Sequence, residues 1–180
     1  DVTRGDEVWN SSQVWYMPFD DMDDPVTDEI SMWPWREAYY TINVCNFILS
    51  RTTGDDASLS ESMKRIKGQA LFLRGYSYYT LAGYYQNPAL ITDYANYSSL
   101  DGLYGKNSTY DDVLDQVEKD FSEAMTLLPS RDAGGEWAKG RATCGAAAGY
   151  YARTLMLRHK YSDALTVLKD IMNKKYGSYK

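Results

Sequence analysis

Histidine and cysteine are scarce in this sequence, and their scarcity excludes much of the chemistry that enzymes use. The 180 residues include one histidine, His159, and two cysteines. A Ser-His-Asp or Cys-His catalytic system would have to be built on that single imidazole. His159 stands near the end of a predicted helix, where a cation interacting with the helix dipole explains its presence. We therefore expect no enzymatic activity.

Long apolar runs and stripes of basic residues are absent as well. Charged or polar residues interrupt every apolar segment before it reaches the roughly 18 residues of a transmembrane helix. The chain has 19 basic and 25 acidic residues, a net charge of −6, and no Lys/Arg stripe that would neutralise phosphates. We expect no nucleic-acid partner, and we expect any membrane attachment to lie outside this chain.

The two cysteines, Cys45 and Cys144, lie far apart in the sequence, each within a segment of helical spacing. Free cysteines are often buried and pack as small apolar side chains, whereas disulfides form in oxidising compartments. The sequence favours two buried free thiols and leaves a disulfide between them as the alternative. Neither interpretation identifies a compartment.

Amphipathic helices account for most of residues 35–180. Apolar residues recur there at steps of three and four, whereas residues 1–34 show no sustained period and form an irregular, aromatic-rich segment. Ser58, Thr109 and Thr143 stand at the positions of N-terminal caps. The pattern predicts helices from Trp35 to near Gly54, from Ser58 to Asn87, from Thr109 to Leu128, from Thr143 to His159 and between Lys160 and Gly177, with a long loop over residues 88–106.

Small residues at matched positions indicate that these helices pair as tetratricopeptide-like repeats. Gly or Ala lets two antiparallel helices approach closely. In the last pair Ala152 and Ala164 are 12 positions apart, which matches one repeat. In the earlier pair Gly75 and Val117 are 42 positions apart, so an insertion of about 30 residues splits the repeat. We expect an all-α fold of paired antiparallel helices, with helix contacts at Gly75, Tyr78, Val117, Phe121, Ala124, Ala152, Ala164 and Leu168.

Aromatic residues crowd into the irregular segment over residues 1–34. Sugar rings present flat C–H faces that pack on aromatic planes, and their hydroxyls need nearby polar donors and acceptors. Trp9, Trp15 and Tyr16 supply the planes, and Arg4 supplies donors. We expect these four residues to contribute to an oligosaccharide-binding platform. The alternative is that the aromatic rings only seal the exposed ends of the helices.

An acidic run over residues 20–24 suggests a metal ion or a hydrolytic site. Calcium binds several converging oxygens, but the order of acids, glycine and glutamate of an EF-hand loop is absent. A glycosidase needs two carboxylates at a fixed separation, one with a raised pKa, and a solvated run provides neither. We interpret the run as a solvated loop, and we expect no metal and no cofactor.

The order of the helical motifs resembles that of the SusD/RagB family. Residues 35–46 resemble its early helix, and residues 69–88, around Leu73-Arg74-Gly75, resemble its long helix with a proline exit. Residues 110–129 resemble the helix that follows, and Gly140-Arg141-Ala142-Thr143 opens the last similar pair. Two positions depart from the pattern. Gly75 stands where the family often has Ala, and Gln86-Asn87 replaces a usual Gly before the proline.

The resemblance implies a surface-exposed lipoprotein of the outer membrane in Bacteroidetes-type bacteria, with its lipid anchor outside this chain. Such proteins cover a SusC-like, TonB-dependent transporter and pass it glycans, or peptides in the RagB branch. Family members also draw ligand contacts from a C-terminal half, so we expect this chain to be a fragment of a larger single SusD-like domain. The alternative function is a tetratricopeptide scaffold that binds a protein or peptide partner in its helical groove.

Overall fold

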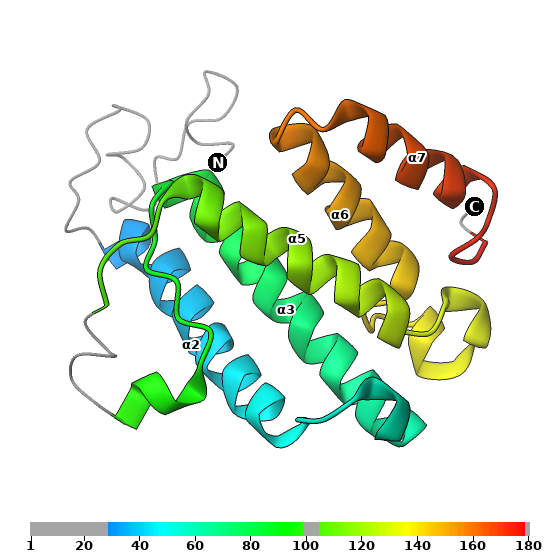
Figure 1. Ribbon diagram of the computed structural model, residues 1–180, viewed down its shortest axis with the longest axis horizontal. Coiled ribbons are helices and arrows are strands. Elements are labelled where there is room, and N and C mark those ends of the chain that lie inside the picture. The colour runs from blue at the N-terminus through cyan, green and yellow to red at the C-terminus, as the bar shows by residue number, and fades with distance from the viewer. Residues whose placement is uncertain (1–28, 99–104, 179–180) are drawn as a thin grey trace, which may run out of the picture. The chain divides into compact units, whose positions relative to one another are not determined.

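The computed structural model describes residues 29–98 and 105–178. Within these ranges the secondary structure is helical and contains no strand, which confirms the all-α prediction. Short 3-10 helices join the longer ones, namely η3 (Asp56–Ser58), η4 (Tyr94–Ser98), η5 (Arg131–Ala133) and η6 (Gly135–Ala138). The α-helices are α2 (Glu29–Arg51), α3 (Glu61–Tyr85), α5 (Tyr110–Leu127), α6 (Cys144–Leu157) and α7 (Tyr161–Met172) (Figure 1).

The chain divides into two units, residues 1–37 and 38–180. The second unit holds α3, α5, α6, α7 and the C-terminal part of α2, and the packing described below is its own. No helix in the described ranges combines the length and the apolar character needed to cross a membrane.

Side-chain caps begin three of the helices. Thr109 and Thr143 accept hydrogen bonds from the backbone N–H three residues later, at 3.2 and 3.3 Å, as predicted. The cap of α3 is Ser60, at 3.3 Å from the Met63 nitrogen, and the prediction of Ser58 is wrong. Ser58 belongs to η3 instead, and its hydroxyl donates to the Asp55 carbonyl at 2.6 Å.

α2 begins at Glu29 rather than at Trp35, where the apolar period starts. Its first turns carry the exposed side chains of Met32 and Trp33, so they show no buried stripe in the sequence. Pro34 lies inside the helix. A proline lacks the N–H of one helical hydrogen bond and is usually found in the first turn of a helix. For this reason the sequence pattern indicated a helix that starts after Pro34.

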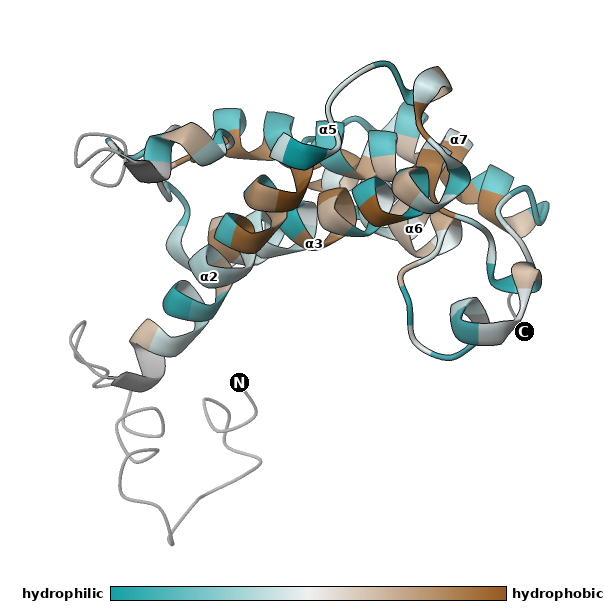
Figure 2. Ribbon diagram, turned by 90° about the horizontal axis from the view of Figure 1, so that it is seen from below, coloured by the Kyte–Doolittle hydropathy of each residue, from teal (hydrophilic) through white to brown (hydrophobic). Residues whose placement is uncertain are grey.

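The helices α3, α5, α6 and α7 pack one against the next, each antiparallel to its neighbour (Figure 1). Hydrophilic and hydrophobic residues lie on opposite sides of α5 (Figure 2). Its Val117, Phe121 and Ala124 are completely buried, as is Tyr78 of α3. These four residues, which the repeat spacing selected, therefore belong to the core around the first helical pair.

Two glycines of α3 allow α5 to approach closely. A Cβ atom at Gly75 would lie 3.2 Å from the Asp120 Cβ atom and from the ring of Phe121. A Cβ atom at Gly68 would lie 2.9 Å from the side chain of Leu128. The structure thus places Gly75 against α5, near Asp120 and Phe121, and Gly68 makes a similar close approach nearer the start of α3.

The second helical pair buries Ala152 of α6 with Ala164 of α7 in one apolar cluster. Leu155 and Val167 complete this cluster together with Ala148. Leu168 is 37% exposed, so Val167 rather than Leu168 supplies the buried side chain of that turn. We predicted Leu168 because it lies four residues after Ala164. In the structure Val167, three residues after Ala164, is the side chain that faces the core.

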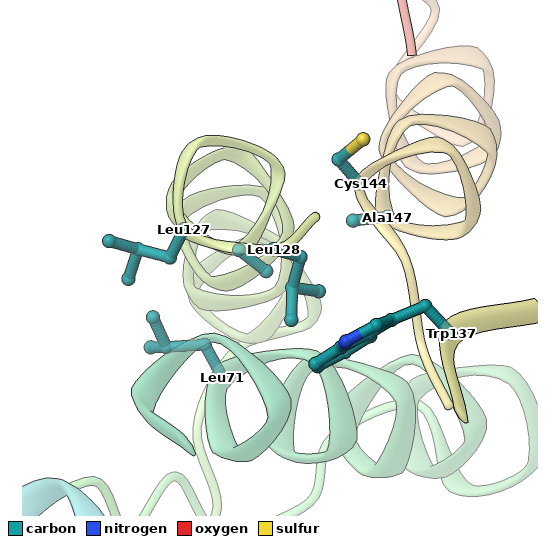
Figure 3. Close-up of a cluster of buried hydrophobic side chains, with 7 residues drawn as sticks. Leu71, Leu127, Leu128, Trp137, Cys144 and Ala147 are labelled. Carbon is teal, nitrogen blue, oxygen red and sulfur yellow. The ribbon is translucent and has the colours of Figure 1, made fainter. Parts of the chain in front are cut away.

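A further apolar cluster joins the end of α5 to the start of α6. Leu71, Leu128 and Trp137 meet there, and Figure 3 shows the Trp137 ring lying along α3 beside Leu128. Cys144 belongs to this cluster and Cys45 is buried in α2, and neither forms a disulfide, which confirms the prediction of free thiols. Burial raises the pKa of Cys45 to about 11, so this thiol is protonated near neutral pH.

A buried ion pair connects α3 to α5. Arg74 donates to both carboxylate oxygens of Asp120, at 2.7 and 2.9 Å, and the Asp120 side chain is completely buried. Gln116 donates to the same carboxylate at 2.7 Å. Burial raises the pKa of Asp120, and the hydrogen bonds from Arg74 and Gln116 oppose that effect. The guanidinium also donates to the Asn46 side chain of α2 at 2.9 Å, so one arginine connects three helices.

The same network holds the start of the inserted loop. Asn46 and Tyr78 donate to the Ile91 carbonyl at 2.7 and 2.8 Å, and the Ile91 N–H donates back to the Tyr78 hydroxyl at 2.7 Å. Arg74 reaches the Thr92 carbonyl at 3.3 Å. Ser108 accepts from the Leu90 N–H at 3.1 Å, so the two ends of the loop are tied together.

Breaking the buried ion pair should destabilise the protein strongly. Asp120→Ala leaves the Arg74 guanidinium buried without its carboxylate, a loss that costs about 3–5 kcal/mol. We expect the free energy of unfolding, measured by urea denaturation, to fall by about this amount. As a control, Glu61→Ala removes an exposed ion pair with Lys64 and an acidic residue from the first turn of α3, and it should lower the free energy of unfolding by only about 1 kcal/mol or less. Equal midpoints for Asp120→Ala and the wild type would contradict the network.

The glycines of α3 should respond to alanine in opposite directions. At Gly68 the new methyl group meets Leu128, and overpacking of this kind costs about 1–3 kcal/mol. At Gly83 no atom lies within 4 Å of the added methyl group, so Gly83→Ala should stabilise the helix by about 0.5–1 kcal/mol. Thermal denaturation of the two variants checks this, and stabilisation by Gly68→Ala would show that α3 and α5 do not approach there.

Candidate functional site

The residues predicted to bind ligand lie outside the described ranges. Arg4, Trp9, Trp15 and Tyr16 all precede residue 29, as does the acidic run over residues 20–24. Their contribution to a sugar platform stays a prediction. The described residues nevertheless contain surfaces with the chemistry of binding sites.

A pocket of about 400 Å³ opens between α2, α3 and η6. This volume lies at the lower end of the range for small-molecule sites, about 300–1,000 Å³. Its apolar lining comes from Ile48 of α2 and from Ile66, Ala70 and Leu73 of α3. Ile66 and Leu73 are each more than 40% exposed. The pocket is therefore an open depression with an aliphatic lining.

The helical period of α3 separates the polar and apolar sides of this pocket. Ser62, Arg65 and Gln69 follow one another at steps of three and four along one edge of the helix. The apolar lining residues of α3 occupy the adjacent edge. One helix thus presents hydroxyl, guanidinium and amide groups beside an aliphatic surface.

Trp137 holds two arginines at the pocket. The guanidinium carbons of Arg65 and Arg141 each lie 5.8 Å from the centre of the indole, within the range of cation–π attraction. Trp137 is 7% exposed, so its ring serves as a fixed support. Arg141 also donates to Glu136 at 2.8 Å, but both side chains of this pair are more than half exposed, so the pair contributes little to stability.

Two polar groups of the pocket have unused hydrogen-bonding capacity. The Gln69 amide nitrogen donates to the Ala142 carbonyl at 2.6 Å, which fixes the amide and leaves its oxygen able to accept. Arg65 forms no ion pair with any carboxylate in the described ranges. A ligand in the pocket would therefore meet one guanidinium that has no direct ion pair, although its charge interacts with that of Glu61 one turn earlier in α3.

An aromatic cluster occupies the adjoining faces of α3 and α6. Tyr150 is its centre, with ring centroids 5.3 Å from Tyr76 and 5.7 Å from Tyr79. The guanidinium of Arg153 lies 5.6 Å from the rings of both Tyr79 and Tyr150. Burial raises the pKa of the Tyr150 hydroxyl. Tyr76 is 44% exposed, so some of this cluster is open to solvent.

The titratable side chains that could take part in catalysis have structural roles instead. Among the described residues no three His, Cys, Asp or Glu side chains gather as a metal site would require. His159 follows the end of α6 with a φ of 58°, and its Nδ1 atom lies 2.7 Å from the Tyr161 hydroxyl. The buried Asp120 is occupied by Arg74. His159 therefore belongs to the end of a helix, and Asp120 belongs to the packed core.

Sequence reasoning missed the pocket. Trp137 was the one signal available, since it stands apart from the four tryptophans of the first 35 residues. The spacing of Ser62, Arg65 and Gln69 can be read from the sequence. It does not show that these residues line a pocket, because that depends on the residues that pack beside them. Here Trp137 and Arg141 arrive from a loop more than 60 positions away in the chain.

Solved structures with the same fold include several proteins with a sugar-binding description. A SusD-like carbohydrate-binding protein from Bacteroides fragilis is 25% identical, with a TM-score of 0.74 over 95% of this chain and 31% of that one. A laminarin-binding SusD-like protein is 22% identical, with a TM-score of 0.73 over 91% and 34%. Surface glycan-binding protein A from Bacteroides uniformis is 20% identical, with a TM-score of 0.75 over 95% and 39%. The chain thus spans 31% to 39% of the length of these proteins.

The family assignment comes from the sequence itself. The comparison with curated proteins gives no match. A SusD-like family model, described as starch-binding and associating with the outer membrane, matches residues 2–156. That match includes the aromatic N-terminal segment, the three helices α2, α3 and α5, and nearly all of α6. The chain therefore belongs to the SusD-like family, as its helical motifs predict.

Proposed function

We propose that this protein captures a glycan, or another nutrient derived from a polymer, at the bacterial cell surface and delivers it to a TonB-dependent transporter of the outer membrane. The observation that carries this proposal is the family match over residues 2–156, whose description combines starch binding with the outer membrane. Two structures of the same fold, the laminarin-binding protein and the surface glycan-binding protein, support a glycan as the ligand class.

The ligand platform in this proposal combines Arg4 with Trp9, Trp15 and Tyr16. Aromatic planes bury the C–H faces of a sugar, and a guanidinium donates to its hydroxyls. Such contacts bind without cleaving, because hydrolysis of a glycosidic bond needs a pair of carboxylates in distinct environments. The partner in this proposal is a SusC-like transporter, and a lipid anchor outside this chain holds the protein at the membrane.

One observation favours the alternative function of a tetratricopeptide scaffold for a protein or peptide. The aromatic cluster around Tyr150 lies on α3 and α6, which are the first helices of the two pairs. Exposed Tyr76 and the guanidinium of Arg153 there resemble the aromatic and arginine anchors of protein interfaces. The glycan function has the stronger support, because the family description names it.

Removing one platform residue should weaken glycan binding without unfolding the protein. Aromatic pairs contribute about 0.5–1.5 kcal/mol beyond burial, and a similar contribution from a sugar face corresponds to a loss of affinity of up to about tenfold. We expect this loss for Trp9→Ala, Trp15→Ala and Tyr16→Ala in calorimetric titrations of the full-length protein. Trp33→Ala is a matched control, since Trp33 is an exposed tryptophan of α2. Unchanged affinity in all three variants, with native circular dichroism, would remove the platform from the proposal.

The purified protein should release no reducing ends from the glycans that it binds. Its binding residues include no carboxylate pair held at a fixed separation, so the expected rate is that of the uncatalysed reaction. A reducing-sugar assay over a long incubation checks this expectation. Hydrolysis that persists through purification and disappears on substitution of one carboxylate in residues 20–24 would show the protein to be an enzyme.

A further inference from the structure

We propose that the pocket between α2, α3 and η6 binds an acidic sugar residue, a uronate, whose carboxylate pairs with the guanidinium of Arg65. This inference rests on the proposed glycan-binding function and adds a ligand class to it. Its residues differ from Arg4, Trp9, Trp15 and Tyr16, which precede the described ranges.

Charge is the first support for an anionic ligand. The charged residues that line the pocket are Arg65, Arg141 and Glu136, which leave one net positive charge. The whole chain has a net charge of −6, so this local excess runs against the general composition. Glu136 pairs with Arg141. Arg65 is therefore the charged lining residue without a direct ion pair, since the nearby carboxylate of Glu61 pairs with Lys64. Its planar guanidinium matches a carboxylate with two parallel hydrogen bonds.

The second support is that the guanidinium is positioned before any ligand arrives. A free arginine side chain loses considerable rotational freedom on binding, which weakens the net affinity. The cation–π contact with the buried Trp137 limits that freedom, and Arg141 lies at the same distance from the indole. A carboxylate that enters the pocket thus meets a guanidinium already restrained at its edge.

The remaining lining suits a sugar ring better than a small inorganic anion. Ile66, Leu73 and their apolar neighbours can cover the C–H face of a pyranose. On the polar edge, the Ser62 hydroxyl donates or accepts, and the Gln69 carbonyl oxygen accepts from sugar hydroxyls. A small anion such as phosphate would use the arginines and the Ser62 hydroxyl but would leave the apolar lining uncovered. A uronate uses the arginine, the polar edge and the apolar lining together.

Calorimetric titration of the full-length protein with an oligogalacturonide and with a neutral oligosaccharide of the same length tests the inference. We expect tighter binding of the oligogalacturonide, and a preference that decreases as salt is added. Arg65→Gln should weaken oligogalacturonide binding about tenfold or more and change neutral binding by less than about twofold. Arg65→Lys, which keeps the charge but loses the planar fork, should fall between Arg65→Gln and the wild type.

Arg131→Gln is the matched control, because it makes the same change of charge in η5 at a residue that does not line the pocket. Oligogalacturonide affinity that is unchanged in Arg65→Gln, or reduced equally in Arg131→Gln, would overturn the uronate site. So would an acidic peptide that binds in an Arg65-dependent way when the oligogalacturonide does not. Failure of the proposed function is a different result, namely that no glycan of either kind binds the wild type. Circular dichroism of each variant confirms that the helices are intact.

Discussion

The ion pair between Arg74 and Asp120 is the interaction on which the arrangement of the second unit depends. A charge removed from water must find a partner, and here the two carboxylate oxygens receive bidentate hydrogen bonds from the guanidinium. The Nη1 atom of Arg74 donates to the Asn46 side chain of α2 and to the Thr92 carbonyl of the loop. Because each group satisfies the others, α2, α3, α5 and the start of the inserted loop have one mutually consistent arrangement.

The long helix α3 connects this core to both candidate binding surfaces. Gly68 and Gly75 let α5 lie close against it. Its N-terminal half supplies Arg65 and the polar edge of the pocket, and its C-terminal half supplies Tyr76 to the aromatic cluster. A surface carried by a packed helix keeps its geometry better than one carried by a loop. The pocket gains a second rigid element from Trp137, which is buried against Leu128.

The polar groups of the described residues are distributed in a way that suits the proposed binding function. The buried carboxylate of Asp120 is occupied by Arg74, and the polar groups that line the pocket are two arginines, a glutamine, a serine and one carboxylate, Glu136, which pairs with Arg141. Such groups hold hydroxyls and carboxylates but cannot supply both an acid and a nucleophile to a glycosidic bond. In the proposed function, selectivity would come from the charge and shape of the ligand. For this reason an arginine without a direct ion pair, in an acidic chain, is informative about ligand class.

The sequence by itself determined the helical class, most helix ends and the pairing of helices. Thr109 and Thr143 cap as predicted, because a cap depends only on residues three positions apart. The small-residue spacing located Gly75, Ala152 and Ala164 for the same reason, since it reflects the local helical period. At the start of α3 two serines could act as the N-terminal cap, and the prediction named the wrong one. Ser58 lies in η3, and Ser60 caps the helix.

Tertiary structure alone decided the contacts between distant residues. Arg74 and Asp120 are 46 positions apart, and Arg65 meets Trp137 across a still longer separation. Nothing in either local sequence indicates the partner, because a guanidinium can pair with many carboxylates or rings of a chain. The fold selects the partner by bringing the two side chains within reach of each other, and in the case of Arg74 and Asp120 it also shields the pair from water. The helices follow from the sequence period, whereas the ion pair and the pocket follow from packing.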